Sequence, residues 1–392
     1  MFNFDFDGKC AFIRVDFNVP MDGDVINDDT RIRAAIPTIK HVLESGGAVI
    51  CASHLGRPKG RRVTSLSMAP IGKHLQSILG DQFTVLSVDS VCGPTALAAA
   101  EALEAGEVLL LENLRFEAGE TTNDAMLAKK LASMADVFIQ EAFGTCHRHH
   151  ASTVGVPSLL KPALPGKLLE KEINAFQRIF KEPNGELLAI IGGAKVSDKI
   201  IVLENLIEKV NAIIIGGGMA YTFLRAQGEE IGDSLFESEY LNVAKKIINK
   251  AVKANVEIHL PVDHKVAKEF DNNSNAKIIT GSIPEKYMGL DIGPETIKKY
   301  EALIAKAATV VWNGPMGVFE FDNFSHGTSA IAQTLANSQC ISIVGGGDSV
   351  AAIKKNNVEK NISHISTGGG AFLEMLEGKD LPGIAVLNQN KS

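Results

Sequence analysis

The stretch "AIIGGAKVSDKI" at residues 189–200 joins an apolar run and a glycine pair to two lysines, Lys195 and Lys199. A short apolar run that ends in glycine is typical of a buried strand, and we expect the following residues to open a helix. Lysines four positions apart would then share one helix face, where like charges cost roughly a few tenths of a kcal/mol and the helix dipole adds to that cost. A bound anion at the helix N-terminus would offset this cost, with two solvated surface lysines as the alternative interpretation.

Similar apolar runs recur along the chain and predict two α/β domains, and those of the second half end in Gly, Asn or Asp. Stretches with a helical period, such as residues 30–47, lie between the apolar runs. This alternation is typical of βαβ units around a parallel sheet, and it restarts after residue 180. We therefore predict two doubly wound, Rossmann-like parallel sheets, with strands at 10–15, 48–53, 83–88, 108–113 and 136–140 in the first, and at 187–193, 211–218, 256–263, 308–314 and 340–347 in the second.

The segment 161–186 separates the two predicted sheets. Prolines stand at its front, an amphipathic helix is predicted at 166–180, and a turn at 183–185 follows. We interpret the helix as an interdomain helix, so the predicted domains are 1–168 and 169–374. Two domains imply a cleft, and ligands of open parallel sheets bind beyond the carboxyl ends of the strands. We expect the active site there.

The composition restricts the class of protein. The 392 residues are 45% hydrophobic and 22% charged, as in soluble globular proteins. No apolar run approaches the roughly 18 residues that span a bilayer, and the start of the chain carries aspartates where a secretory signal is basic. The five cysteines are scattered without a C-x-x-C pair, which indicates reduced thiols, and the net charge of -7 argues against nucleic acid binding. We predict a cytoplasmic protein with no nucleic acid and no membrane partner.

An anion site in such an acidic chain must be a local positive cluster, and the first predicted domain contains one. Any single arginine is more often a surface residue, but five of them fall at or after successive strand ends, and arginine suits bidentate binding of phosphate and carboxylate. Asp16 and Asn18 would accept hydrogen bonds from a hydroxyl of the same ligand. A metal site in "CHRHH" at 146–150 is disfavoured, because adjacent positions point in different directions and its arginine would repel a cation. The basic cluster comprises Arg14, Arg31, His54, Arg57, Arg115 and Arg148.

The second predicted domain carries groups that suit a nucleotide. Glycine triplets at 216–218, 345–347 and 368–370 predict backbone that approaches a ligand closely. Glu320 is a candidate for binding a ribose hydroxyl and Asp348 for a magnesium ion, with a solvated helix face or a turn as the alternatives. No loop fits the P-loop pattern G-x-x-x-x-G-K-[ST] or the dinucleotide pattern G-x-G-x-x-G.

Ten strings, taken in order, resemble the signatures of the phosphoglycerate kinase family. They run from Arg14 to Glu374 and are "RVDFNVP", "SHLGRP", "ENLRF", "AFGTCHRHHAS", "GGAKVSDKI", "GGGMAYTF", "DIGPET", "WNGPMGVFE", "GGGDS" and "STGGGAFLE". Two departures are visible. Ser349 stands where the family usually has threonine, and Cys146 and His149 lie around the key arginine of the fourth string.

The resemblance implies a glycolytic, monomeric kinase that transfers a phosphoryl group reversibly between 1,3-bisphosphoglycerate and ADP, giving 3-phosphoglycerate and MgATP. It also implies that the C-terminal tail 375–392 packs on the first domain. By matching motif, the phosphoglycerate would be held by Asp16, Phe17, Asn18, Arg31, His54, Leu55, Gly56, Arg57, Arg115 and Arg148. Nucleotide and Mg²⁺ would be held by Lys195, Lys199, Glu320, Gly346, Gly347, Asp348 and Ser349, with Gly217, Asn313 and Pro315 beside the adenosine.

Phosphoryl transfer needs positioning and electrostatic stabilisation, and here no general base, since the attacking oxygen is already ionised near neutral pH. We expect the moving phosphoryl group to be neutralised after domain closure by Arg31, Lys195, Lys199 and the amides of Gly347 and Gly369. Two alternatives to a kinase are a nucleotide-dependent dehydrogenase and a non-catalytic, two-lobed anion-binding protein.

Overall fold

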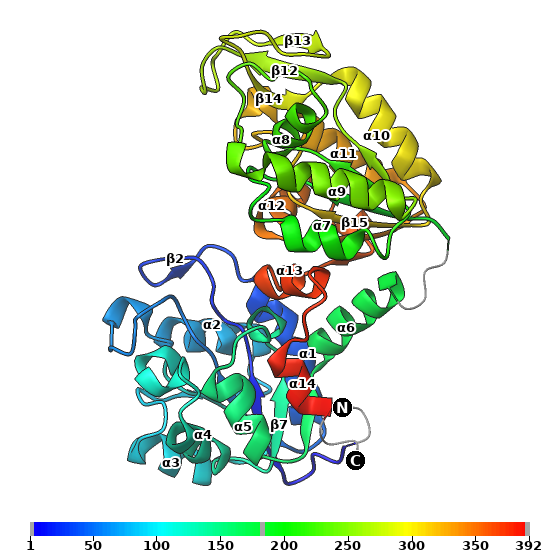
Figure 1. Ribbon diagram of the computed structural model, residues 1–392. Coiled ribbons are helices and arrows are strands. Elements are labelled where there is room, and N and C mark those ends of the chain that lie inside the picture. Colours follow the sequence, from blue (N-terminus) through cyan, green and yellow to red (C-terminus); the bar gives the residue numbers. More distant parts are fainter. Residues whose placement is uncertain (1–3, 181–184, 389–392) are drawn as a thin grey trace. The chain divides into compact units, whose positions relative to one another are not determined.

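The computed structural model describes residues 4–180 and 185–388 of the chain. These residues form two compact units, each a sheet covered by helices (Figure 1). The first unit comprises the described parts of Met1–Asn174 and Asp380–Ser392, and the second comprises the described parts of Ala175–Lys379.

The first unit is built on a six-stranded sheet in which every neighbouring pair of strands is parallel. Nearly all side chains of its three central strands are buried, which is why these strands read as continuous apolar runs. The five predicted strands are confirmed, and a short edge strand, β8, adds to them. The order across the sheet is β5 (Thr84–Ser87), β6 (Glu107–Leu110), β4 (Ala48–Ala52), β1 (Cys10–Arg14), β7 (Val137–Gln140) and β8 (Ala163–Pro165).

Helices cover this sheet, and the helical period predicted after residue 30 is confirmed as α1 (Thr30–Glu44). Ile32, Ile39 and Val42 recur on one face of α1 and pack in the same core cluster as Ile13 of β1. A two-stranded hairpin, β2 (Met21–Asp22) with β3 (Val25–Ile26), precedes α1. The other helices that precede α6 are α2 (Ala69–Leu79), α3 (Pro94–Glu101), α4 (Ala125–Ala132) and α5 (Val156–Leu159).

The end of the chain returns to the first unit as α14 (Pro382–Asn388), the red helix beside α5 in Figure 1. It contacts α5 and β8, and the Gly383 amide donates to the Cys146 carbonyl (2.9 Å). The returning segment begins at Asp380, because the preceding helix α13 (Gly370–Leu376) packs against the second unit's α7.

The helix predicted at 166–180 is confirmed as α6 (Lys167–Phe180), and the boundary between the units falls within it. Its buried Leu169 and Ile179 lie on one face, as an amphipathic helix requires. The predicted turn at 183–185 lies largely outside the described residues.

The second unit also has a six-stranded, all-parallel sheet, which confirms the predicted fold class. Its order is β11 (Glu257–His259), β10 (Ala212–Ile215), β9 (Leu187–Ile191), β15 (Thr309–Asn313), β16 (Ile341–Val344) and β17 (His364–Ile365). The helices of this unit that follow α6 and precede α13 are α7 (Ile200–Leu206), α8 (Met219–Ala226), α9 (Leu241–Lys253), α10 (Pro294–Lys306), α11 (His326–Asn337) and α12 (Gly347–Lys355). No helix in the described part of the chain is long and apolar enough to cross a bilayer.

A three-stranded antiparallel sheet in the second unit was not predicted. It consists of β13 (Lys277–Thr280), β12 (Asp263–Ala267) and β14 (Met288–Ile292), in that order. The first residues of β12 are polar, and the residues that form hydrogen bonds with them are distant in the sequence. Asp263, for example, accepts from the Thr296 amide (2.8 Å) and hydroxyl (2.6 Å). Local apolar periodicity therefore does not show this sheet.

Candidate active site

Arg14 ends β1 and is fully buried, so this member of the predicted basic cluster lies beneath the surface. Its Nε donates to Ser152 Oγ (2.8 Å), which donates to Glu120 Oε1 (2.6 Å). Its Nη2 lies 3.3 Å from His54 Nδ1. Burial lowers the pKa of Arg14, and the carboxylates of Glu120 and Asp16 oppose this effect. Arg14 is therefore a paired internal cation that contacts the site through His54.

The loops after β1 and β4 are tied together by Asn18. Its Oδ1 accepts from the Gly56 amide (2.8 Å), and its carbonyl accepts from Arg31 Nη1 (2.9 Å). The same Nη1 pairs with Asp16 Oδ2 at 3.3 Å, while the Arg31 side chain remains 37% exposed. The structure thus brings four of the predicted substrate residues into one network and leaves Arg31 accessible to a ligand.

Arg115 and Arg148 add positive charge to this edge of the first sheet. Arg115 Nη1 donates to the Gly56 carbonyl (2.8 Å), and its buried Nε has no hydrogen-bond partner in the described part of the chain. Burial lowers the pKa of Arg115, and the charges of Arg14 and Arg148 act in the same direction. Arg148 and Arg57 are exposed. No hydrogen bond or ion pair among the described residues directs the Arg57 side chain toward the cluster. Guanidinium groups that repel one another in this way favour a bound anion.

The buried histidines of this cluster are neutral near pH 7. Burial, followed by the charges of Arg14 and Arg115, holds the pKa of His54 well below its ordinary value. The same causes lower the pKa of His150 to about 4. The positive charge of the site therefore comes from arginine.

Phe17 and Leu55, predicted as substrate residues, have buried side chains. Only their backbone lies near the site, and hydrogen bonds fix its position. The Phe17 amide donates to Ser53 Oγ (2.8 Å), and the Leu55 amide donates to Asn113 Oδ1 (3.2 Å). Sequence analysis missed Asn113, which also accepts from the Arg115 amide (3.1 Å). Its position directly after β6, inside "ENLRF", is the signal that could have found it.

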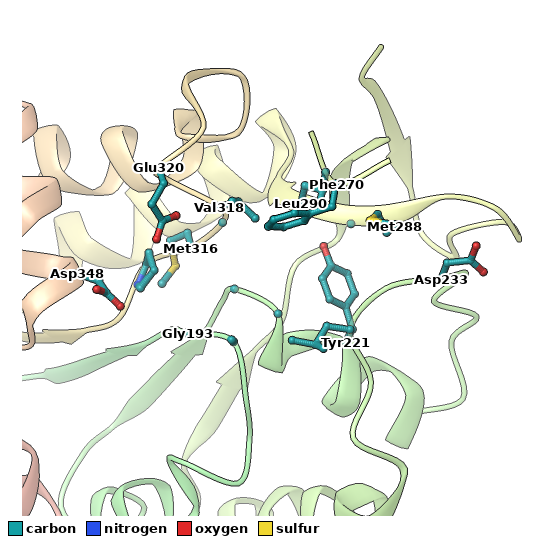
Figure 2. Close-up of a pocket in the computed structure, with 17 residues that line it drawn as sticks. Gly193, Tyr221, Asp233, Phe270, Met288, Leu290, Met316, Val318, Glu320 and Asp348 are labelled. Atoms are coloured by element: carbon teal, nitrogen blue, oxygen red, sulfur yellow. The ribbon is translucent and has the colours of Figure 1, made fainter. Parts of the chain in front are cut away.

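A cavity of about 470 Å³ lies at the carboxyl ends of β9, β10 and β15 in the second unit (Figure 2). The carboxylates of Glu320 and Asp348 line one end of it, and apolar side chains including Phe270 and Met288 line the region around Tyr221. This volume is typical of small-molecule sites. An apolar region suits a base and the carboxylate end suits a ribose and a phosphate-bound cation.

Gly217 and Gly314 show why glycines crowd the loops around the cavity. Both have positive φ values, +69° and +99°. A Cβ on Gly217 would lie 2.5 Å from the Gly193 carbonyl oxygen, and one on Gly314 would lie 2.2 Å from that of Gly192. Glycine is thus required in these loops because the loops pack against one another. At Gly347, by contrast, a Cβ would meet nothing within 4 Å, so packing does not require glycine there.

The residues between β9 and α7 are not helical, so the prediction that Lys195 and Lys199 share a helix face is wrong. Helix α7 begins at Ile200, with Lys199 as its N-cap. Glu237 explains the difference, because it accepts from both the amide (3.1 Å) and the hydroxyl (2.7 Å) of Ser197 and holds a turn there. The two lysines occur in different environments: Lys195 is exposed and Lys199 is partly buried.

Lys199 Nζ donates to Asn313 Oδ1, and Asn313 Nδ2 donates to the Gly345 carbonyl (2.8 Å). Burial lowers the pKa of Lys199, while Asp198 and Asp348 raise it. Asn313 is buried and is not among the residues that line the cavity, and its side chain positions Lys199.

Ser349 is buried in the first turn of α12, where its Oγ accepts from the Gly314 amide (2.6 Å). This hydroxyl therefore holds the loop after β15. Of the predicted nucleotide residues, those that line the cavity are Gly217, Pro315, Glu320 and Asp348.

The chain's own residues fit a magnesium ion that arrives with phosphates. Asp348 presents one exposed carboxylate at the cavity. No group of three or more His, Cys, Asp or Glu side chains in the described ranges is arranged to hold a metal. Mg²⁺ commonly takes one or two protein carboxylates together with substrate phosphates, which matches this donor set.

Fold and site together define a class of protein. Each unit is a parallel α/β sheet with a ligand site at its strand ends. The first offers guanidinium groups to an anion, and the second offers a nucleotide-sized cavity with Lys199 and two carboxylates nearby. These are the features of an α/β enzyme that handles phosphorylated ligands.

Known proteins identify the family. The family model for phosphoglycerate kinase matches residues 1–379. Phosphoglycerate kinases from Roseiflexus sp. (strain RS-1) and Synechococcus elongatus (strain ATCC 33912 / PCC 7942 / FACHB-805) are both 51% identical to this chain over 98% of its length, covering 97% and 96% of their own. The structure of phosphoglycerate kinase from Coxiella burnetii matches with a TM-score of 0.92 and 44% identity, covering 100% of this chain and 99% of that one.

The chain therefore belongs to the phosphoglycerate kinase family, and it is a phosphotransferase, a kinase of glycolysis. The resemblance seen in its motifs is confirmed. The dehydrogenase and the non-catalytic binding protein are excluded as alternatives.

Proposed function

We propose that this enzyme transfers the phosphoryl group between 1,3-bisphosphoglycerate and ADP by direct in-line displacement. In the reverse direction, a carboxylate oxygen of 3-phosphoglycerate bonds to the γ-phosphorus of ATP, the bond from that phosphorus to the bridging oxygen breaks, and ADP leaves. The observation that carries this proposal is the arginine-rich strand ends of the first unit, a local positive cluster in a chain of net charge -7.

The phosphoglycerate binds at this edge of the first sheet. Arg148 and Arg115 contact its phosphate, because their charges repel each other and the buried Arg115 Nε lacks a hydrogen-bond partner among the described residues. Asp16 and Asn18 accept from its hydroxyl, and Arg31 pairs with its carboxylate. His54 and the loop of Leu55 and Gly56, whose amides are held by Asn113 and Asn18, complete the site, with Arg57 and Phe17 at its border.

The nucleotide binds in the cavity of the second unit, with its base in the apolar region around Tyr221 and its ribose near Glu320. The phosphates extend past Asp348 toward Lys199 and the open backbone of Gly347 and Gly369, where an added Cβ would meet nothing within 4 Å. Amides at a helix N-terminus and a lysine suit phosphate oxygens. Gly346, Ser349 and Lys195 support or border this phosphate region.

Magnesium is the implied cofactor, and Asp348 is the residue that would hold it. The ion supplies charge neutralisation of the phosphates when it is bound. No general base is required, because the attacking carboxylate or phosphate oxygen is ionised at neutral pH, and buried His54 is itself neutral.

Transfer requires both ligands to meet, and we propose that closure of the two units accomplishes this step and excludes water. Arg31, Lys195 and Lys199 then neutralise the moving phosphoryl group, together with the amides of Gly347 and Gly369. The enzyme acts in the cytoplasm, in keeping with its free cysteines, and as a monomer, as its resemblance to the family implies.

A coupled assay tests the reaction. The purified chain with MgATP and 3-phosphoglycerate should oxidise NADH when glyceraldehyde-3-phosphate dehydrogenase is supplied to consume the acyl phosphate. Omission of either substrate, or of Mg²⁺ with a chelator present, should abolish the signal. A chain that binds both ligands without turnover would overturn the proposed reaction.

A further inference from the structure

Glu141 is a buried carboxylate outside both ligand sites, and it lies where α6 begins. It follows β7 directly, and its amide donates to the Arg14 carbonyl at the end of β1 (2.9 Å). Its Oε1 and Oε2 each lie 3.2 Å from the Leu168 amide, and Oε2 lies 3.5 Å from the Leu169 amide. The carboxylate thus serves amides of the first turn of α6, which have no partners within the helix.

Thr38 completes this junction from α1. Its hydroxyl donates to Glu141 Oε1 and accepts from the Lys167 amide (2.9 Å). The Gly166 amide donates to the Gln140 carbonyl (2.8 Å). The amides at the start of α6 are therefore held by groups from two other elements, α1 and the end of β7.

The approach of Glu141 to this turn is very close. A Cβ on Gly166 would lie 1.9 Å from Glu141 Oε2. Only glycine leaves room for the carboxylate at this position. The junction is therefore specified by three residues that lie far apart in the sequence, Thr38, Glu141 and Gly166.

The junction lies on the same face of α1 as Arg31, the candidate substrate-binding residue at the start of this helix. Arg31 and Thr38 are seven residues apart, which places them on the same helix face about two turns from each other. One face of α1 thus carries a substrate-binding arginine at its start and the contact to α6 further along. Helix α6 continues across the boundary between the two units.

We propose that Glu141 is a positioning residue, which fixes the direction in which α6 leaves the first unit relative to α1 and its Arg31. The inference rests on the proposed function, in which both units act on one phosphoryl group. Loss of one acceptor oxygen of Glu141 leaves each ligand site intact but misaligns the groups that must meet, so kcat falls while the KM values change little.

Glu141→Gln and Thr38→Val test the proposal. Each variant keeps the shape of the side chain and removes one part of the junction. Each should lower kcat by about fivefold or more, with both KM values within about twofold of wild type. Thr38→Ser retains the hydroxyl and should restore kcat.

Asp263→Asn is a matched structural control from the second unit. Asp263 is also a fully buried carboxylate that accepts from two amides of a helix start, Glu295 (3.0 Å) and Thr296 (2.8 Å), and from a threonine hydroxyl. Helix α10, which it caps, carries no residue of either site. This variant should lose thermal stability but keep kcat within about twofold of wild type.

Two results would overturn the proposal: unchanged kcat in folded Glu141→Gln and Thr38→Val, or an equal loss of kcat in Asp263→Asn. If Glu141→Gln does not fold, as judged by circular dichroism, Thr38→Val and its rescue by serine decide the outcome. An inactive wild-type chain would overturn the proposed function and this inference with it. An active wild type with unaffected variants overturns the inference alone.

Discussion

At the scale of single residues, an amide oxygen helps to orient one cation in each site, and in the first unit Asp16 also pairs with Arg31. Asn18 holds Arg31 in the first unit, and Asn313 holds Lys199 in the second. The amide oxygen of Asn313 orients Lys199 without neutralising it, so this charge remains available to a phosphate. This arrangement suits a reaction in which catalysis consists of positioning and electrostatic stabilisation.

Lys199→Ala should lower kcat by about two orders of magnitude, as expected for loss of one donor to the transition state. Steady-state kinetics with both substrates saturating measures this effect. Lys209→Ala is the control, because the exposed Lys209 lies outside the cavity lining, with its Nζ 2.9 Å from Asn205 Oδ1 and 5.4 Å from the centre of the Phe180 ring. A kcat of Lys199→Ala within about threefold of wild type would remove Lys199 from the transition state.

Arg148→Ala should act mainly on binding of the phosphoglycerate. A charge-assisted hydrogen bond to phosphate contributes about 1.5–3 kcal/mol, so KM for 3-phosphoglycerate should rise by about tenfold or more, with KM for ATP unchanged. Arg33→Ala, which removes an exposed arginine paired with Asp29 at 2.9 Å, is the control. An unchanged KM for 3-phosphoglycerate would place Arg148 outside the site.

At the scale of elements, the loops after the strands of the second unit pack backbone to backbone. The Gly192 amide donates to the Asn313 carbonyl (2.9 Å), and the Gly217 amide donates to the Met316 carbonyl (3.0 Å). These contacts build the floor of the cavity from three strand ends. A side chain within them would separate the loops, so the glycines support the cavity even where they do not line it.

Gly314→Ala should destabilise the second unit more than Gly228→Ala does. Both glycines have φ near +100°, but a Cβ at Gly228 would meet nothing within 4 Å, whereas one at Gly314 would lie 2.2 Å from a backbone oxygen. Gly228→Ala should cost about 1–2 kcal/mol from the left-handed backbone alone. Urea unfolding of the two variants measures the difference, and equal midpoints would contradict the packing argument.

The junction of α6 with α1 predicts a pH dependence of stability. Burial raises the pKa of Glu141 from 4.5 to about 8, against the hydrogen bonds of Thr38 and the α6 amides that lower it. Between about pH 4.5 and pH 8, the folded protein retains a proton on Glu141 that the unfolded chain has lost. The contribution of Glu141 to the stability of the fold is therefore complete below about pH 4.5 and is lost progressively up to about pH 8. Between pH 5 and pH 8.5, the melting temperature of wild type should fall relative to that of Glu141→Gln. A constant or growing advantage of wild type would contradict the raised pKa.

At the scale of the whole molecule, the chain divides its function between two units of similar architecture. Each has a six-stranded parallel sheet, and each presents its ligand groups at the carboxyl ends of the strands. In the proposed mechanism neither set of groups suffices for transfer, since one would hold the acceptor and the other the nucleotide. Motion of the units is therefore the expected event of the catalytic cycle.

Small-angle X-ray scattering should detect that motion. The radius of gyration should fall when 3-phosphoglycerate and a non-hydrolysable MgATP analogue are both present. Either ligand alone serves as the control and should produce a smaller change. An unchanged radius of gyration with both ligands bound would defeat the proposal that closure assembles the site.

Much of this organisation could be predicted from sequence because it depends on local patterns. Apolar runs of five residues that end in glycine specify buried parallel strands, and the amphipathic period at 166–180 specifies α6. The ten motif strings identified the family, and nine of them lie at the carboxyl ends of strands in the two parallel sheets. The sequence by itself thus determined the fold class, the family and most candidate residues.

Only the tertiary structure decided how individual groups are used. It placed Arg14 in the interior, where its Nε donates to Ser152 Oγ, and it brought Lys199 Nζ into hydrogen-bond contact with Asn313 Oδ1. It also started α7 at Ile200, because Glu237 holds the preceding turn from 40 residues away. Each of these outcomes depends on a hydrogen bond between residues distant in the chain. Local periodicity carries no information about such partners, and burial makes their pairing obligatory.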